Sequence, residues 1–205
     1  MNDILSYLDE LYPSAKCELN YNKDYELLIA IVLSAQTTDK RVNNVTKVLF
    51  SKYPSIYELS VAPISDIENI IREIGTYQRK SKYIHEITKK LYDDGYDIVP
   101  NNRKYLESLP GVGHKTANVF LSMIYDEPAI AVDTHVSRVS KRLSLVNKND
   151  DVLKIEKKLM KKIPKDRWSR AHHQFVLFGR YICKAKKPEC SICKLKSICK
   201  NKNQV

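Results

Sequence analysis

The chain has 205 residues, which is long enough for one large domain or two smaller lobes with a substantial core, so stability alone requires no disulfide or cofactor. Lys and Arg number 35 against 24 Asp and Glu, giving a formal net charge of +11. Clustered basic side chains bind polyanions by releasing counterions, so nucleic acid is the first expected partner, although a generally lysine-rich proteome would give the same excess.

The N-terminal segment MNDILSYLDELYP is acidic and amphipathic. It lacks the positively charged region and the small-residue cleavage site of a signal peptide. No run of 18 apolar residues follows anywhere, so we expect no membrane-spanning segment. The sequence predicts a cytoplasmic protein, associated with the nucleoid if its partner is DNA.

Apolar residues recur with helical spacing along almost the whole chain. Residues 25–35, YELLIAIVLSA, are apolar on nearly all sides and predict a helix buried at the centre of a domain. Ser55 with Glu58, and Ser65 with Glu68, have the spacing of a capping box, so each serine predicts a helix start. Prolines mark the joins and no hairpin turn separates alternating segments. We expect an all-α fold of about ten or eleven short helices.

Two of the five glycines lie in the stretch LPGVGHKTANVF. Residues 101–109 predict a short helix, a tight turn follows, and a second helix begins at about His114. Free N–H groups at the start of that helix would point toward a phosphate oxygen, as in a helix-hairpin-helix that binds the DNA backbone. Gly111, Val112 and Gly113 are the expected contacts. An ordinary helical turn with a glycine after the first helix is the alternative.

The C-terminal part contains one amphipathic helix and then a basic tail. Apolar residues at the helical period predict the helix, and they are Val152, Ile155, Leu159, Met160 and Ile163. Its lysine-rich face is expected to be solvated. Residues 179–205 carry +7 of the net charge and too few apolar residues to order themselves by packing alone.

Four cysteines in this tail have the pattern C-x6-C-x2-C-x5-C, at Cys183, Cys190, Cys193 and Cys199. Four thiolates can bind one tetrahedral metal ion or hold a four-iron cluster, and either would tie the tail into a loop. Zinc sites usually pair two short C-x2-C segments, whereas only one is present here, which favours iron and sulfur. Cys17 is expected to be a buried apolar residue.

The segments LPGVGHKTAN, AVDTH and LSAQTTD, together with the cysteine pattern, resemble endonuclease III, a family of bifunctional DNA glycosylases and abasic-site lyases in the helix-hairpin-helix superfamily. The resemblance implies two all-α lobes with a cleft between them. The first is a helical-barrel lobe of residues 18–128 that carries the hairpin. The second combines residues 1–17 and 129–205 and holds a [4Fe-4S] cluster, which would position a basic loop on DNA.

The resemblance also implies the catalytic residues. Lys115 would attack C1′ of the damaged nucleotide, release the base and form a Schiff base that undergoes β-elimination. A lysine amine must be neutral to attack, and with an ordinary pKa near 10.4 only about one in a thousand is neutral at pH 7.4. Desolvation by pocket walls and the flipped nucleotide is expected to supply the activation. Without the resemblance, Lys115 would be assigned to pairing with a DNA phosphate.

Asp133 precedes an expected helix start, where aspartate is a good N-cap, and it would also stabilise positive charge developing on the sugar. The resemblance also implies that Gln36 would fill the gap left by the extruded nucleotide. The family's second wedge is an apolar residue at the position of Thr76. This departure leaves the second wedge and the opposite-base preference open, with Tyr77 or Gln78 as possible substitutes.

The expected substrate is duplex DNA containing oxidised pyrimidines or abasic sites, bound by a monomer. The nearest alternative is a glycosylase of the same superfamily without lyase activity, although those enzymes lack a lysine at this position. A second alternative is a non-catalytic DNA-binding or redox-sensing cluster protein. Asp39, His172 and His173 are expected to be structural rather than catalytic.

Overall fold

A computed structural model describes residues 1–200 of the chain. Those residues contain no strand, which confirms the all-α prediction. The helices are α1 Asn2–Leu11, α2 Asp24–Ser34, α3 Asp39–Lys52, α4 Ile56–Ser60, α5 Ile64–Ile70, α6 Tyr77–Asp93, α7 Arg103–Ser108, α8 His114–Ile124, α9 Thr134–Arg142, α10 Val152–Lys162 and α11 Trp168–Tyr181, with short 3-10 turns η1 Lys165–Arg167 and η2 Lys194–Ser197.

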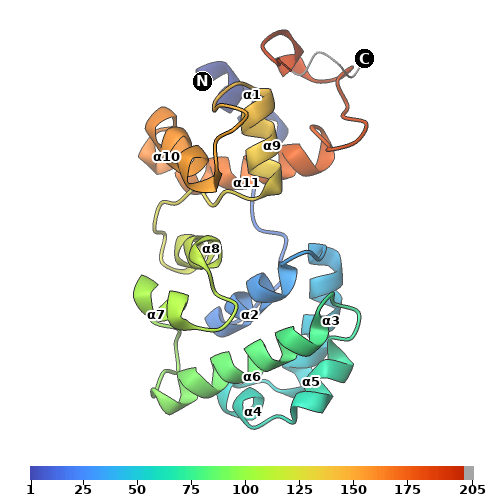
Figure 1. Cartoon of the computed structure of the whole chain (residues 1–205), viewed down its shortest axis with the longest axis vertical. Coiled ribbons are helices and arrows are strands. Elements are labelled where there is room, and N and C mark those ends of the chain that lie inside the picture. The colour runs from blue at the N-terminus through green and yellow to red at the C-terminus, as the bar shows by residue number, and fades with distance from the viewer. Residues whose placement is uncertain (201–205) are drawn as a thin grey trace. The chain divides into compact units, whose positions relative to one another are not determined.

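The chain divides into two compact units. Unit 2, Glu18–Tyr125, is built around α2, which contacts α3, α6 and α8 (Figure 1). Every residue from Tyr25 to Leu33 is buried, so this helix has no solvent-facing side, as its composition predicts. The first residue of the helix, Asp24, accepts a hydrogen bond of 2.5 Å from the backbone N–H of Val99.

Unit 1 consists of Met1–Cys17 and Asp126–Val205. Helices α1 and α9 both pack against α11 (Figure 1). The core lies among these helices, and Leu8, Val139 and Phe178 in it are almost fully buried. The N-terminal helix therefore packs against a helix more than 150 residues further along the chain. Burial of these apolar side chains supplies most of the favourable free energy of folding of this unit.

Asp9 of α1 connects this helix to α11 and to the turn before it through its carboxylate. Its carboxylate accepts hydrogen bonds from Arg167 at 2.7 Å and from Gln174 at 2.9 Å, and it forms an ion pair with Arg170 at 2.9 Å. The Gln174 hydrogen bond is the largest influence on the pKa of Asp9, which lies below its ordinary value despite an opposing effect of burial.

One of the two predicted helix starts is present, but Glu58 accepts a hydrogen bond of 2.8 Å from the Ser55 hydroxyl rather than from the backbone N–H that a full capping box requires. Ser55 is the N-cap of α4, and its hydroxyl accepts a hydrogen bond of 3.1 Å from the backbone N–H of Glu58. The prediction for Ser65 is wrong, because α5 begins at Ile64 after Pro63 and Ser65 already lies inside the first turn. The ring of Pro63 fixes its backbone φ angle, here −58°, at the start of α5, and no serine cap is present there.

Several local expectations also differ from the structure. The first hairpin helix spans Arg103–Ser108, shorter than residues 101–109, because Asn102 is its N-cap and accepts a hydrogen bond from Tyr105. Val152 is 49% exposed, since it lies in the first turn of α10 beyond the reach of the core. Cys17, predicted to be buried, is only half-buried, and it is the last residue of the N-terminal segment of unit 1.

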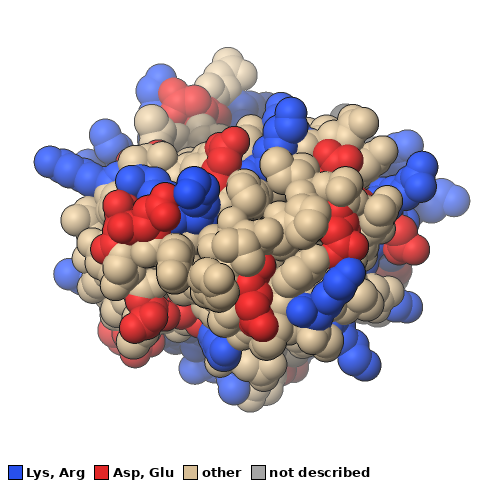
Figure 2. Space-filling view, turned by 90° about the horizontal axis from the view of Figure 1, so that it is seen from below, with Lys and Arg blue, Asp and Glu red and all other residues tan. Residues whose placement is uncertain are grey.

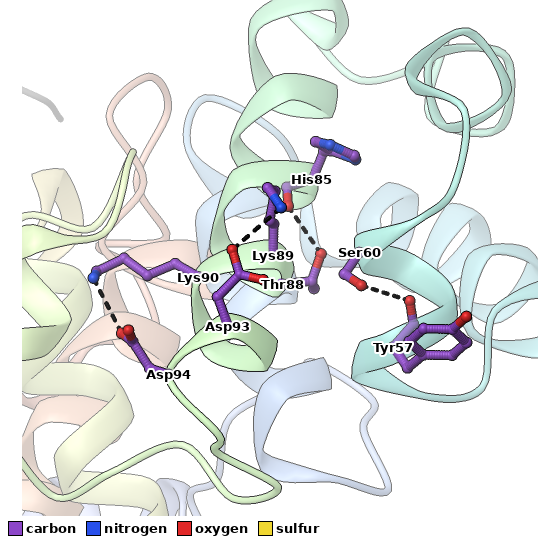
Figure 3. Close-up of polar contacts among 8 residues, drawn as sticks. All are labelled: Tyr57, Ser60, His85, Thr88, Lys89, Lys90, Asp93 and Asp94. Atoms are coloured by element: carbon purple, nitrogen blue, oxygen red, sulfur yellow. Dashed lines mark hydrogen bonds and ion pairs between the residues drawn. The ribbon is translucent and has the colours of Figure 1, made fainter.

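The long helix α6 packs along α4, and the rings of Tyr57 and Tyr92 join the two helices with centroids 5.2 Å apart. At the end of α6, Lys89 and Lys90 pair with Asp93 and Asp94 one turn further on (Figure 3). Seen from the side of α4 and α6, basic and acidic side chains are interspersed (Figure 2). No helix among residues 1–200 has the length and apolar character needed to cross a membrane.

Candidate active site

The predicted hairpin is present in unit 2. Helix α7 ends at Ser108, a turn follows, and α8 begins at His114, as the sequence predicts. Val112 is 4% exposed and its N–H donates to the carbonyl of Leu109 at 3.1 Å, so the turn is anchored to the core by its central side chain. The N-cap of α8 is Gly113, which has no side chain to accept the first N–H groups of the helix.

The two glycines of this turn serve different purposes. Gly111 has a left-handed backbone with φ +77°, and a Cβ atom there would lie 2.6 Å from the ring of Tyr83, so the fold itself requires glycine. Gly113 has φ −96°, and a Cβ atom there would have no neighbour within 4 Å. Nothing in the fold therefore requires glycine at position 113, where a Cβ atom would lie in open space.

A polar network joins the two hairpin helices, and the sequence did not predict it. Arg103 donates a hydrogen bond of 2.6 Å to the side-chain oxygen of Asn118, which is 3% exposed. The amide nitrogen of Asn118 lies 3.2 Å from Nε2 of His114, and Nδ1 of His114 lies 3.4 Å from Glu107. An asparagine on the otherwise apolar face of α8 was the available signal, because a buried amide needs partners.

Lys115 is the second residue of α8 and its side chain is exposed. It therefore follows the glycine turn directly, at the positive end of the helix dipole. The expectation that pocket walls and a flipped nucleotide together desolvate this amine stays a prediction.

Asp133 belongs to unit 1 and is half-buried at the start of α9. Its carboxylate accepts a hydrogen bond of 2.7 Å from the backbone N–H of Val136, which confirms the N-cap prediction. A carboxylate that accepts one N–H bond still has lone pairs for a second partner. The capping role and a role toward a substrate are therefore compatible in this residue.

Gln36 lies in the turn after α2 and is exposed, with a left-handed backbone at φ +59°. Thr76 immediately precedes α6, is also exposed, and has φ +58°. Such angles are uncommon for residues other than glycine, and especially so for a β-branched residue. Gln36 and Thr76 therefore lie at strained, solvent-facing positions, which are often functional.

The four tail cysteines are all half-buried, and three of them, Cys183, Cys193 and Cys199, pack against the core of unit 1. Burial raises the pKa of the Cys193 thiol, and the charges of the other three cysteines act on it in the same direction. Across residues 1–200, no group of three or more His, Cys, Asp or Glu side chains is close enough to hold a single metal ion.

Two arginines of α9 bind the beginning of the tail, another contact that the sequence did not reveal. Arg142 donates to the carbonyl of Lys184 at 2.7 Å and lies 3.3 Å from the sulfur of Cys183. Arg138 donates to the carbonyls of Gly179 and Cys183 at 2.7 and 3.0 Å. Side-chain hydrogen bonds from α9 therefore help to order this segment, and the buried Leu195 adds an apolar contact.

The remaining candidates have structural surroundings. His172 is 8% exposed and its ring lies 5.0 Å from that of His173, whose pKa is lowered by burial. Asp39 is half-buried in the first turn of α3, where its charge complements the helix dipole.

Comparison with known proteins identifies the relatives of this chain. Residues 29–165 match the family model described as HhH-GPD superfamily base excision DNA repair protein. The chain is 46% identical to endonuclease III of Bacillus subtilis (strain 168), over 96% of this chain and 90% of the relative. It is 40% identical to endonuclease III of Haemophilus influenzae, over 99% of this chain and 96% of the relative.

Solved structures give the same result. A trapped endonuclease III–DNA covalent intermediate superimposes with a TM-score of 0.93 and 48% identity, covering 97% of this chain and 93% of the other. A non-covalent endonuclease III–DNA complex matches with the same values. A thermostable thymine-DNA glycosylase shares the fold, with a TM-score of 0.80 and 24% identity.

Proposed function

The chain belongs to the HhH-GPD superfamily of base excision DNA repair proteins and to its endonuclease III family, and we propose that Lys115 and Asp133 carry out the chemistry. It is a DNA glycosylase and abasic-site lyase that acts on oxidised pyrimidines in duplex DNA. A relative that is 48% identical has been trapped covalently on DNA. The observation that carries the proposal is an exposed amine, Lys115, placed directly after the glycine turn.

The amine of Lys115 forms a bond to C1′ of the damaged nucleotide as the bond from C1′ to the base breaks. The base leaves with the bonding electron pair and takes up a proton. Opening of the sugar ring gives a Schiff base, which makes the C2′ proton acidic. Loss of that proton expels the 3′ phosphate, and water then hydrolyses the Schiff base and regenerates the lysine.

Asp133 would stabilise the positive charge that develops on the sugar as the base departs. A carboxylate near a lysine raises the pKa of the amine, so Asp133 is unsuited to deprotonate Lys115 by its charge alone. The hydrogen bond to Val136 at 2.7 Å holds the carboxylate in one orientation, which makes its electrostatic effect available without reorganisation.

DNA binding is assigned to the hairpin and to two exposed turns. Gly111 and Val112 shape the hairpin turn, while Gly113 admits a phosphate to the start of α8. Gln36 and Thr76 are proposed to enter the duplex where the nucleotide is extruded, since both are exposed at strained turns. The enzyme would then act on the nucleoid in the cytoplasm.

Members of this family carry a [4Fe-4S] cluster, and we assign its ligands to the four tail cysteines. A single tetrahedral ion needs all four sulfurs within about 2.3 Å of one point. In a cluster each thiolate binds a different iron, so the sulfurs lie further apart. Three of these cysteines pack against the same core of unit 1, which supports a shared site in the tail. The bound cluster would supply a structural link for the basic loop.

Borohydride trapping on abasic-site duplex DNA tests the role of Lys115. The parent should form a covalent complex and Lys115→Ala should form none, because no amine remains to give the Schiff base. Lys104→Ala is the matched control, since it removes another exposed lysine of the same hairpin and should be trapped like the parent. Undiminished trapping of Lys115→Ala would refute the assignment, and absence of trapping in the parent would indicate a glycosylase without lyase activity.

Asp133→Asn tests the second residue, because asparagine also caps helices and should preserve the bond to Val136. We expect slower base release with DNA binding retained. Asp151→Asn is the control, since Asp151 caps α10 in the same way with a bond of 2.8 Å to Lys154. If both variants lose stability equally and neither loses activity, Asp133 serves only as a cap.

A further inference from the structure

Lys80 has an unusual environment. It is 4% exposed, and no other lysine or arginine among the described residues is buried to this degree. Its ammonium group donates to the carbonyl of Leu33 at 2.9 Å and to the carbonyl of Ala35 at 2.7 Å. Burial lowers the pKa of Lys80, and the positive charge of Arg79 lowers it further.

These two carbonyls lie at the end of α2, where the last carbonyls of a helix have no intrahelical partner. Ser34 closes another of them by donating to Ile31 at 2.8 Å. Lys80 therefore caps the C-terminal end of α2, although it lies in α6, 45 residues after Ala35 in the sequence. A cation is electrostatically favourable at this end of a helix.

The peptide bond that Lys80 holds is the one that precedes Gln36. Because Gln36 has φ +59°, its backbone is strained, and such a conformation persists only when its surroundings impose it. The hydrogen bond from Lys80 to Ala35 is a contact of this kind.

Lys80 also lies one turn after Thr76. Its backbone N–H donates to the carbonyl of Thr76 at 3.1 Å, in the first turn of α6. A single buried residue therefore contacts the backbone of both strained turns in unit 2. Filling this site with an apolar side chain would avoid the cost of burying a charge, so stability alone does not account for a lysine.

We propose that Lys80 is a positioning residue that fixes the turn of Gln36 relative to the turn of Thr76, so that both enter the duplex together when a nucleotide is extruded. This inference rests on the proposed function, in which these two turns contact the DNA. Lys80 touches neither the reacting sugar nor the base. Its loss should therefore slow extrusion while leaving the chemistry of Lys115 intact.

The test compares Lys80→Met, which keeps the length of the side chain without its charge, with Lys80→Arg, which keeps a cation. Lys89→Met is the control, because it removes an exposed lysine of the same helix. Substrates are a duplex containing thymine glycol, with a neighbouring 2-aminopurine that fluoresces on extrusion, and a single-stranded abasic oligonucleotide for borohydride trapping.

In Lys80→Met we expect extrusion and single-turnover base release to fall by about 10- to 100-fold, the scale of a misplacement of about 1 Å. Trapping on the single strand, which needs no extrusion, should stay within about twofold of the parent, since Lys115 is unchanged. Lys80→Arg should recover most of the lost rate, and Lys89→Met should match the parent.

Three results would overturn the inference. The first is an unchanged rate of extrusion in Lys80→Met. The second is a loss of trapping in proportion to extrusion, and the third is a loss of helical circular dichroism. Either of the last two would mean that Lys80 only stabilises the fold. A parent that neither releases the base nor is trapped would instead refute the proposed function itself.

Discussion

At the residue scale, the fold requires glycine at position 111 but not at position 113, two residues further along the chain. The first has a left-handed backbone and the ring of Tyr83 beside it, whereas the second has ordinary angles and open space. Composition alone treats both as turn glycines. The side chain of Tyr83, which comes from α6, distinguishes them.

Substituting each glycine by alanine should therefore give opposite outcomes. Gly111→Ala should destabilise the protein by about 1 to 2 kcal/mol from the backbone alone, with further cost from the overlap with Tyr83. Gly113→Ala should leave stability unchanged or slightly higher, since alanine loses less entropy on folding, yet it should weaken DNA binding. Thermal unfolding and a fluorescence anisotropy titration with duplex DNA measure the two properties. Equal DNA affinity in Gly113→Ala and the parent would contradict the phosphate assignment.

At the element scale, unit 1 depends on α1 and α11, which are brought together from opposite ends of the chain. Leu8 and Phe178 supply the apolar contact, and Asp9 adds charged hydrogen bonds to α11 and its approach. The lysine face of α10 stays exposed, as expected for a solvated surface, with Lys157 and Lys161 both exposed.

The lowered pKa of Asp9 has a consequence for stability against pH. A carboxyl group whose folded pKa is depressed stabilises the folded state above its unfolded pKa, which is near 3.8, and this contribution disappears as the pH falls through the lower folded value. Asp9→Asn should therefore lower the unfolding midpoint at neutral pH, by about 2 to 4 °C for each 1 kcal/mol lost. At acidic pH the unfolding midpoints of Asp9→Asn and the parent should lie closer together.

Thermal circular dichroism at neutral and acidic pH measures this difference, and Glu10→Gln is the matched control. Glu10 is the next residue of α1, but its ion pair with Lys194 is exposed and such pairs contribute little. A difference between Asp9→Asn and the parent that stays constant down to acid pH would exclude the ionised carboxylate as the source of the stabilisation.

At the scale of the whole molecule, the positive charge is distributed unevenly between the two units. Unit 2 contains 14 Lys and Arg against 13 Asp and Glu, whereas unit 1 contains 21 against 11. Almost the whole net charge therefore belongs to the unit with the cysteine tail. The long-range attraction to DNA should originate there, while unit 2 supplies the hairpin and the two exposed turns.

Salt dependence of DNA binding tests this division. Each phosphate neutralised contributes about −0.9 to the slope of log affinity against log salt concentration. Lys186 and Lys187 are exposed in the tail, and replacing both by alanine should reduce the slope by up to about 1.8. The double variant at Lys157 and Lys161 removes the same charge from α10 and should leave the slope unchanged. Equal effects in the two variants would indicate that only net charge matters.

The sequence by itself determined the features that depend on neighbouring residues. The all-apolar segment of α2, the glycine turn before α8 and the caps at Ser55 and Asp133 follow from side chains within a few positions of one another. Resemblance added the family, because several short motifs in one order are far more specific than any single one. The error at Ser65 arose because the helix begins at Ile64, with Pro63 and not a serine at its N-cap.

Only the tertiary structure decided which distant side chains complete these elements. Lys80 binds the end of α2, Arg142 binds the start of the cysteine tail, and Arg103 reaches Asn118 across the hairpin. A local sequence pattern predicts that a lysine or arginine on a helix is an exposed charge. Its true partner is a carbonyl or amide that chain folding brings within 3 Å, because a buried polar group must be satisfied wherever the partner lies in the sequence.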